Sequence, residues 1–272
     1  TNRHFFNQLG QRVIQSVTRV GPGGKLYDVD VRLRPLGRSG ELAITINDLR
    51  RYFANQSGQM WERQALCKAR PIWGSQGAQA AAMECVREIL QQVDDPSVAA
   101  SEIYQHRYQL QQGAGDCNLK RGTGGTMDIE FDVQFLQLAN AKTAPQCLVP
   151  GTLLAIEQLQ AIGALDESTA SDMISDYEFL RQIESGIRLM NMSARHELPK
   201  TSEELDRLAF LLSTSHVQQS TRQEQESEPS TALTGAQMAD GCINRMAAVR
   251  TRFERHFASY LPQEEADPAP SE

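Results

Sequence analysis

The sequence lacks the long apolar runs and the excess of basic residues that mark several protein classes. No apolar run in its 272 residues approaches the ~20 residues that a membrane-spanning helix needs. The N-terminus shows no basic-then-apolar secretion signal. The net charge of −7 argues against a general nucleic-acid-binding protein, which usually displays a strongly basic face. We therefore expect a cytoplasmic protein that binds neither nucleic acid nor a membrane.

Metal-binding patterns of cysteine and histidine are also missing. The five cysteines are odd in number and widely separated, and the five histidines are scattered. None has the paired spacing of a zinc site, so we expect reduced thiols, as in a reducing compartment. What the sequence does contain is 40% apolar and 22% charged residues, which is ordinary for a soluble protein long enough for two domains.

Charge is distributed unevenly along the chain. Residues 1–130 hold 16 basic and 13 acidic residues, whereas residues 131–272 hold 11 basic and 21 acidic ones. The more basic half contains a segment, residues 26–34, in which charged and apolar side chains alternate. Successive side chains of a β-strand point to opposite faces, so this alternation predicts a strand with one core face and one charged face. The charged face would hold Asp28, Asp30, Arg32 and Arg34.

This charged face has two interpretations. Carboxylates flanked by valines suit a hard metal such as Mg²⁺, and the guanidinium groups farther along suit phosphate oxygens, which together indicate metal-assisted phosphoryl or nucleotidyl transfer. The alternative is an antiparallel strand with a solvated, self-neutralising face, since exposed faces are normally polar. Alternation alone favours the second interpretation.

Hydrophobic spacing predicts helices over most of the remaining chain. A short second strand is expected near residues 42–46. The expected helices cover residues 2–18, 49–53, 61–66, 76–93, 97–112, 128–138, 152–162, 168–192, 202–213 and 235–259. Residues 214–232 and the tail after residue 260 are polar and poor in large apolar side chains, which predicts disorder.

A glycine-rich loop precedes the helix expected at residues 128–138. Free backbone N–H groups at such a loop can bind an anion. Acidic residues in the first turn of a helix commonly accept hydrogen bonds from the same groups, so plain capping is the favoured interpretation. An interdomain contact is the third possibility. The residues concerned are Lys120, Arg121, Gly124, Gly125, Asp128 and Glu130.

Three separated motifs occur in a recognisable order. They are Tyr27-Asp28-Val29-Asp30-Val31-Arg32-Leu33-Arg34-Pro35, Trp61-Glu62-Arg63-Gln64-Ala65-Leu66-Cys67-Lys68-Ala69-Arg70, and Gly124-Gly125-Thr126-Met127-Asp128-Ile129-Glu130-Phe131 with Gln134. These motifs resemble the glutamine synthetase adenylyltransferase/deadenylase family. Weaker similarity at Phe179–Glu184 and His196–Pro199 extends the resemblance over most of residues 1–213.

The resemblance implies an α+β fold with a truncated nucleotidyltransferase domain of the DNA polymerase β type, followed by a mostly α-helical bundle. In this division, residues 1–75 are the C-terminal part of the nucleotidyltransferase domain and residues 76–213 are the helical domain. Residues 214–232 are a disordered insertion, 233–260 the terminal helix of the helical domain, and 261–272 a disordered tail.

The resemblance also implies an activity and a site. Family members use ATP and Mg²⁺ to attach AMP to a tyrosine of glutamine synthetase, which regulates nitrogen assimilation, and a paired domain removes it by phosphorolysis. Asp30 matches the third metal-binding carboxylate and is the expected catalytic residue. Arg32 and Arg34 would orient phosphates or hold Asp30, and Asp28 would support the site from behind the metal ligand.

One departure from the family pattern is important. The family's first motif, a Gly-Ser loop followed by an Asp-x-Asp strand, is expected upstream of Phe5, and the sequence contains no such segment. We therefore expect a truncated portion of an enzyme that is inactive alone, because a single carboxylate should bind Mg²⁺ weakly. The alternative is a non-catalytic helical module over residues 76–259 that binds glutamine synthetase or a PII signalling protein. The motifs do not distinguish the adenylylating from the deadenylylating half.

Overall fold

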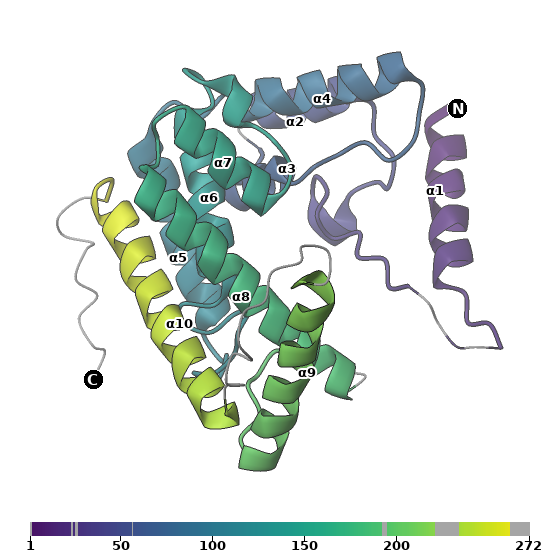
Figure 1. The fold of residues 1–272 in the computed structure, drawn as a ribbon. Coiled ribbons are helices and arrows are strands. Elements are labelled where there is room, and N and C mark those ends of the chain that lie inside the picture. The colour runs from purple at the N-terminus through teal and green to yellow at the C-terminus, as the bar shows by residue number, and fades with distance from the viewer. Residues whose placement is uncertain are drawn as a thin grey trace. The chain divides into compact units, whose positions relative to one another are not determined.

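The structure, a computed structural model, describes residues 2–22, 24, 27–55, 57–191, 195–220 and 234–261. Helices and their connections make up this part of the chain (Figure 1). The α-helices are α1 (Asn2–Thr18), α2 (Ile46–Ala54), α3 (Met60–Cys67), α4 (Gln76–Leu90), α5 (Pro96–Gln111), α6 (Thr126–Asn140), α7 (Thr152–Ala161), α8 (Glu167–Asn191), α9 (Ser202–Ser220) and α10 (Gly235–Ala258). Two short 3-10 helices are η1 (Gly37–Ser39) and η2 (Pro145–Cys147).

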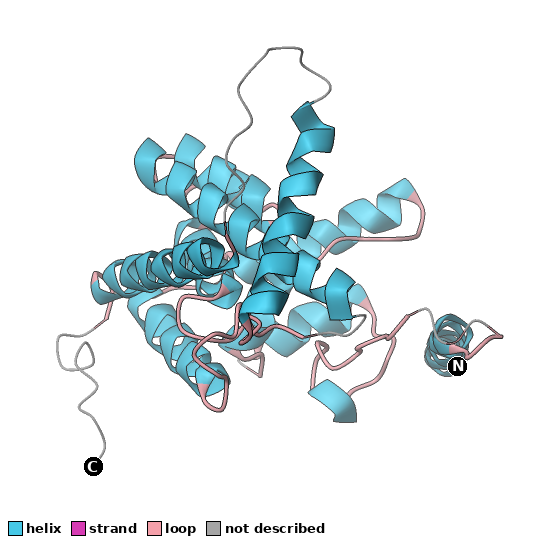
Figure 2. Cartoon of the chain, turned by 60° about the horizontal axis from the view of Figure 1, so that its bottom comes forward, coloured by secondary structure: helices cyan, strands magenta, loops and turns pink. Residues whose placement is uncertain are grey.

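The predicted α+β class is wrong for the described residues. Figure 2 shows helices and loops there and no strand, and the only extended pairing within them consists of isolated β-bridges. Residues 27–34 and 41–45 are irregular, and the side chains of the supposed core face, such as Tyr27 and Leu33, are 64% and 69% exposed. The physical reason is that a strand needs a partner for its backbone N–H and C=O groups, and no described segment pairs with this one.

The predicted helices are confirmed, because their sequences carry both the apolar spacing and the end signals. Before α5, the Asp95 carboxylate accepts a hydrogen bond from the Ser97 N–H at 2.8 Å, and Pro96 occupies the first turn, where its missing N–H costs nothing. At α9 the Thr201 hydroxyl accepts from the Glu204 N–H at 3.3 Å. These local signals fix where the helices begin.

The chain divides into two compact units, each of which is described by itself. Unit 1 consists of Thr1–Asp94 and Asn140–Pro150, and unit 2 of Asp95–Ala139 and Gly151–Glu272. The domain boundary at residue 75 that the resemblance implies stays a prediction. The insertion predicted at 214–232 overlaps the end of α9, and its residues 221–232 lie outside the described residues, as does the tail from residue 262.

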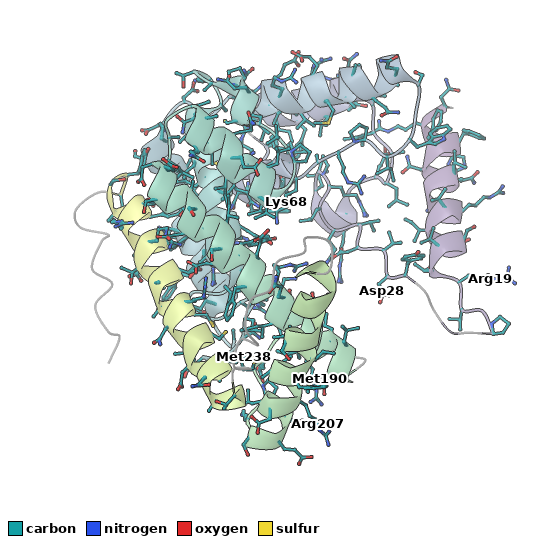
Figure 3. The ribbon with its side chains drawn as sticks, viewed as in Figure 1. Arg19, Asp28, Lys68, Met190, Arg207 and Met238 are labelled. Atoms are coloured by element: carbon teal, nitrogen blue, oxygen red, sulfur yellow. The ribbon has the colours of Figure 1, made fainter. Side chains whose placement is uncertain are left out.

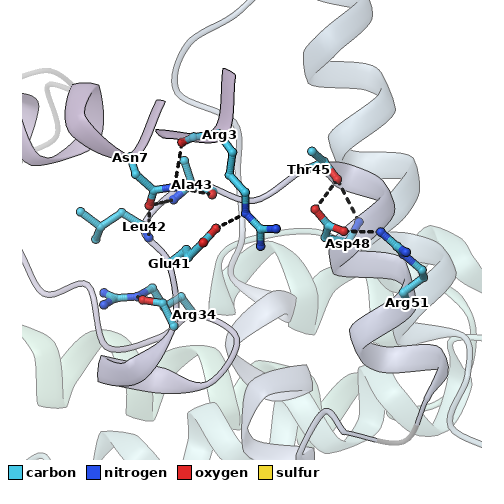
Figure 4. A network of polar contacts seen from close by, with 10 residues as sticks. Arg3, Asn7, Arg34, Glu41, Leu42, Ala43, Thr45, Asp48 and Arg51 are labelled. Atoms are coloured by element: carbon cyan, nitrogen blue, oxygen red, sulfur yellow. Dashed lines mark hydrogen bonds and ion pairs between the residues drawn. The ribbon is translucent and has the colours of Figure 1, made fainter. Parts of the chain in front are cut away.

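Unit 1 has a small core and a peripheral first helix. Phe53 of α2 packs with Cys85 and Ile89 of α4, and this cluster is surrounded by half-buried apolar side chains. None of the α1 residues is buried. Instead, the Asn7 side chain accepts hydrogen bonds from the backbone N–H groups of Leu42 and Ala43 at 2.8 and 3.2 Å. A few polar contacts therefore tie α1 to the following segment (Figure 4).

Unit 2 has a larger, aromatic core. Phe135 of α6 lies 4.7 Å, ring centre to ring centre, from Phe257 of α10, which in turn lies 4.5 Å from Phe253. Tyr104 of α5 stacks on Phe253 at 5.9 Å. Helix α6 is buried along most of its length, as expected from the apolar side chains that cover much of its circumference. Within the described residues, no helix has both the length and the apolarity that a bilayer crossing requires.

Candidate functional site

The predicted catalytic carboxylate forms an exposed ion pair with its near neighbour. The Arg32 guanidinium donates to both Asp30 oxygens, with Nε–Oδ1 at 2.9 Å and Nη2–Oδ2 at 2.6 Å, and the Arg32 backbone N–H donates to Oδ1 at 3.0 Å. These hydrogen bonds lower the pKa of Asp30 to about 2. Asp30 is therefore a carboxylate at neutral pH, on an exposed segment that it shares with Asp28 (Figure 3).

The second predicted phosphate ligand holds a turn together. The Arg34 guanidinium donates to the backbone carbonyls of Gly40 at 3.1 Å and of Arg38 at 3.3 Å, and also to that of Val31. The chain reverses here through Leu36 and Gly37, both of which have a positive φ. Arg34 lies half-buried in this turn, beside the contacts of residues 41–43 with α1 (Figure 4). In this arrangement its donors satisfy backbone carbonyls.

The described residues do not by themselves form a magnesium site at Asp30. Both Asp30 oxygens accept hydrogen bonds from Arg32. Within the described part of the chain, there is no group of three or more His, Cys, Asp or Glu side chains that could hold a metal ion. Mg²⁺ demands near-octahedral coordination by several oxygens, so the pair formed by Asp30 and Arg32 does not fit the ion as it stands.

The first turn of α6 contains a buried ion pair. The Arg107 guanidinium of α5 lies 2.5 Å from Asp128, and the side chains of both residues are 0% exposed. Arg250 of α10 approaches the same carboxylate to 3.6 Å, and the Gly124 N–H donates to it at 2.7 Å. Arg107 also donates to the Gly122 carbonyl at 2.8 Å. Asp128 thus joins α5, α10 and the glycine-rich loop to the start of α6.

Burial dominates the electrostatics of this cluster. Loss of water raises the pKa of Asp128 and lowers the pKa of Arg107, while the charges of Arg107 and Arg250 act in the opposite direction on Asp128. One turn later on α6, Asp132 pairs with the Nδ1 of His256 at 2.7 Å, and burial likewise raises the pKa of Asp132. Arg107, Asp128 and Asp132 lie in the interior of unit 2, with side chains 0%, 0% and 3% exposed.

The glycines of the loop allow close backbone packing. A Cβ on Gly124 would lie 1.8 Å from the Met246 carbonyl oxygen of α10, and one on Gly125 would lie 2.8 Å from the carbonyl oxygens of Leu119 and Lys120. Since the Gly124 N–H is donated to Asp128, the geometry supports the capping interpretation of this loop. Anion binding at this loop stays a prediction, and none of the contacts described above favours it.

The remaining predicted residues of this loop are engaged within unit 2. The Arg121 guanidinium donates to the Leu110 carbonyl at 2.7 and 3.0 Å. The Glu130 carboxylate accepts a hydrogen bond from the Tyr177 hydroxyl at 3.0 Å. The carbonyl of Lys120 accepts the Met127 N–H at 3.1 Å. Thus the loop residues come together in unit 2, whereas Asp28, Asp30, Arg32 and Arg34 lie in unit 1.

Sequence reasoning missed the partners of the acidic residues on α6. A signal was available, because two aspartates four residues apart share one face of a helix that is apolar on much of its circumference, and buried there they need cations. The spacing could not identify those cations, which come from distant parts of the chain. These cations are Arg107, Arg250 and His256. A further ion pair joins Asp176 of α8 to Arg252 of α10.

Family comparisons agree with the order of the motifs. A family model described as glutamate-ammonia ligase adenylyltransferase matches residues 1–85, and one described as GlnD PII-uridylyltransferase matches residues 98–232. The region before α5 and the helical region that follows therefore match two different descriptions.

Several curated relatives share one name, bifunctional glutamine synthetase adenylyltransferase/adenylyl-removing enzyme. The chain is 32% identical to the relative from Hahella chejuensis over 215 residues and 35% identical to that from Nitrosomonas eutropha over 211 residues. These alignments cover 78% and 75% of this chain and 22% of each relative. The relative from Thioalkalivibrio sulfidiphilus aligns at 29% identity with 98% of this chain and 26% of its own length.

These similarities define a nucleotidyltransferase family. The chain belongs to the glutamine synthetase adenylyltransferase/adenylyl-removing family, and the predicted resemblance is confirmed. It spans about a quarter or less of the length of the relatives it matches.

Proposed function

We propose that this chain is a region of an enzyme that attaches AMP to, or removes it from, a tyrosine of glutamine synthetase with ATP and Mg²⁺, and that it acts in the cytoplasm to regulate nitrogen assimilation. The observation that carries the proposal is the pair of family matches over residues 1–85 and 98–232, in the order in which the quoted motifs occur. The names of the aligned relatives support the same reaction class.

Within this proposal the charged groups have different roles. Asp30 and Arg32 are exposed charged members of the first motif, so a nucleotide or a partner protein can reach them. Arg34 would support them by holding the turn that follows, and Asp28 would lie behind Asp30. The Asp128 cluster would keep α5, α6 and α10 in one arrangement and take no part in the chemistry.

We further propose that this chain is inactive alone. Asp30 is bound by Arg32, and the described residues supply no set of oxygen ligands for a divalent ion around it. In an active enzyme, additional carboxylates would have to come from other residues, and Arg32 would have to release at least one oxygen of Asp30.

The test uses the intact mass of glutamine synthetase subunits after incubation with ATP and Mg²⁺. This chain alone should add no AMP. A protein of the relatives' full length that carries this region should add AMP, and its Asp30→Ala variant should lose that activity while still binding glutamine synthetase. AMP transfer by the chain alone would refute its inactivity, and an Asp30→Ala enzyme with unchanged activity would remove Asp30 from the site.

A second function is favoured by one observation. The match over residues 98–232 is to a family described as a PII-uridylyltransferase, which suggests that the helical region binds a PII signalling protein or glutamine synthetase without contributing chemistry. Surface plasmon resonance with each immobilised partner would test this. Saturable binding by the chain, together with unchanged activity of the full-length Asp30→Ala enzyme, would favour the binding module. No binding to either partner would exclude it.

A further inference from the structure

A cavity beside the start of α9 in unit 2 is lined by charged and polar side chains. It has a volume of about 500 Å³ and opens to solvent. Its polar lining comes from two parts of the chain that are distant in sequence: the loop before α6, and the stretch from the end of α8 to the start of α9. The principal side chains are Asn118, Asn191, Arg195, His196, Lys200 and Glu204.

The wall of this cavity is fixed by backbone pairing. The Leu119 N–H donates to the His196 carbonyl at 2.7 Å, and the Leu198 N–H donates to the Cys117 carbonyl at 3.1 Å. These bonds flank an isolated antiparallel bridge between Asn118 and Glu197. Because Leu119 and Leu198 are themselves 0% and 5% exposed, the bridge is anchored in the core of unit 2. The cavity is therefore preformed on this side.

A buried carboxylate orients the imidazole that lines the cavity. The Nδ1 of His196 lies 2.5 Å from Glu184, whose side chain is 2% exposed. Arg181 and Arg188 also contact Glu184, at 2.7 and 3.3 Å. With Nδ1 held by a carboxylate, the ring is fixed and Nε2 is the nitrogen that a ligand can approach.

One acidic group of the lining is held by the protein itself. Glu204 accepts a hydrogen bond from the Thr201 hydroxyl at 3.1 Å, as part of the start of α9. The other acidic residue of the lining, Glu197, is exposed, and its backbone is paired with Asn118. By contrast, Arg195 and Lys200 make no ion pair with another described residue. The cationic groups are thus the ones left for a ligand.

We propose that this cavity is a binding site for a small oxyanion, either a phosphate or a carboxylate group of a small molecule. Arg195 and Lys200 supply the charge, and the Nε2 edge of the oriented His196 ring and the side chains of Asn118 and Asn191 border the ligand. Charge-assisted hydrogen bonds from such groups are the strong class of contact to phosphate and carboxylate oxygens. The site is separate from the charged segment around Asp30 and does not depend on the proposed transferase activity.

Inorganic phosphate and acetate are the probes for this proposal. The full chain, labelled with ¹⁵N at histidine, is titrated with each at constant ionic strength, while calorimetry measures the dissociation constant. Binding by one or both probes should be saturable and should shift the His196 Nε2 resonance. The probe that binds more tightly identifies the oxyanion. An unshifted His196 resonance, or a response that never saturates, would overturn the proposal without any variant.

Matched variants locate the site. Arg195→Ala and Lys200→Ala should each weaken binding of the favoured probe by about tenfold or more, which corresponds to about 1.4 kcal/mol. Arg207→Ala is the control, because Arg207 is exposed on α9 and pairs with Glu203 outside the cavity. It should leave binding within about twofold. Equal weakening by all three substitutions would show general charge attraction and refute the site. Thermal unfolding of each variant checks that the fold is intact.

Discussion

The same two residue types, aspartate and arginine, form ion pairs with opposite consequences in the two units. In unit 1, Asp30 and Arg32 are two residues apart in sequence and their side chains are 54% and 63% exposed. In unit 2, Arg107 and Asp128 come from different helices and are fully buried. Water competes with the first pair and is excluded from the second. A local exposed pair leaves its carboxylate accessible, whereas a distant buried pair locks helices together.

The loss of the buried pair should have the largest effect. Asp128→Asn would leave the Arg107 charge buried without an anion, and breaking such a pair typically costs about 3–5 kcal/mol. We expect this decrease in the free energy of unfolding by urea, measured by circular dichroism. The double variant Arg107→Met/Asp128→Asn removes the unpaired charge and should recover part of the loss. A loss below about 1 kcal/mol for Asp128→Asn would remove the distinction between the two pairs.

The close approach of the loop to α10 gives the next largest effect. Gly124 has φ +73° and a Cβ there would clash with the Met246 carbonyl. Gly124→Ala should therefore lower the free energy of unfolding by more than about 2 kcal/mol, because the strain of a positive φ and the displacement of the α10 backbone add. Gly113 provides the control, because it has φ +77° and open space around it. Gly113→Ala should show the backbone strain alone, about 1 kcal/mol by the same unfolding measurement. Equal losses would mean that the loop is not tightly packed on α10.

A buried glutamate in unit 1 should have a smaller effect. Glu62 is 6% exposed. Its carboxylate accepts hydrogen bonds from the Tyr52 hydroxyl at 3.0 Å and from the Gln59 N–H at 2.8 Å. Neither of these donors is a cation that would be left buried and unpaired. Glu62→Gln keeps an acceptor oxygen, so we expect a loss of about 1 kcal/mol. Chemical denaturation monitored by tryptophan fluorescence measures it. A loss as large as that of Asp128→Asn would show that unit 1 depends on a buried charge as strongly as unit 2 does.

The exposed pair should influence titration more than stability. The pKa of Asp30 is about 2, below its usual value of 3.8, so the carboxylate favours the folded state above pH 4 and this contribution is lost as the pH falls through 2. Carboxyl ¹³C NMR should find this low pKa, and Arg32→Gln should return it towards 3.8. The midpoint of unfolding at pH 7 should not change measurably, because solvent screens the pair. A pKa that Arg32→Gln leaves unchanged would show that the pair does not form in solution.

The helices and the strands were not equally predictable. Helical spacing over residues 2–18 or 76–93 leads to a helix because the hydrogen bonds of a helix lie within the segment, and caps such as Asp95 with Pro96 mark its start. Alternation over residues 26–34 indicates only which side chains would share a face if the segment were a strand. A strand also requires a second strand, and the described residues provide none.

In the candidate site, too, local features were predictable and contacts between distant residues were not. The sequence by itself determined the family, the positions of the helices and the importance of Asp128 at the start of α6, because motifs, periodicity and capping are properties of neighbouring residues. Only the tertiary structure decided that Asp128 is neutralised by Arg107 and Arg250, that Gly124 lies against the backbone of α10, and that Arg34 holds a turn. These contacts join residues from 3 to 122 positions apart. Most of them depend on which helix faces pack together, and that choice is made by burial of the whole apolar surface rather than by any local pattern.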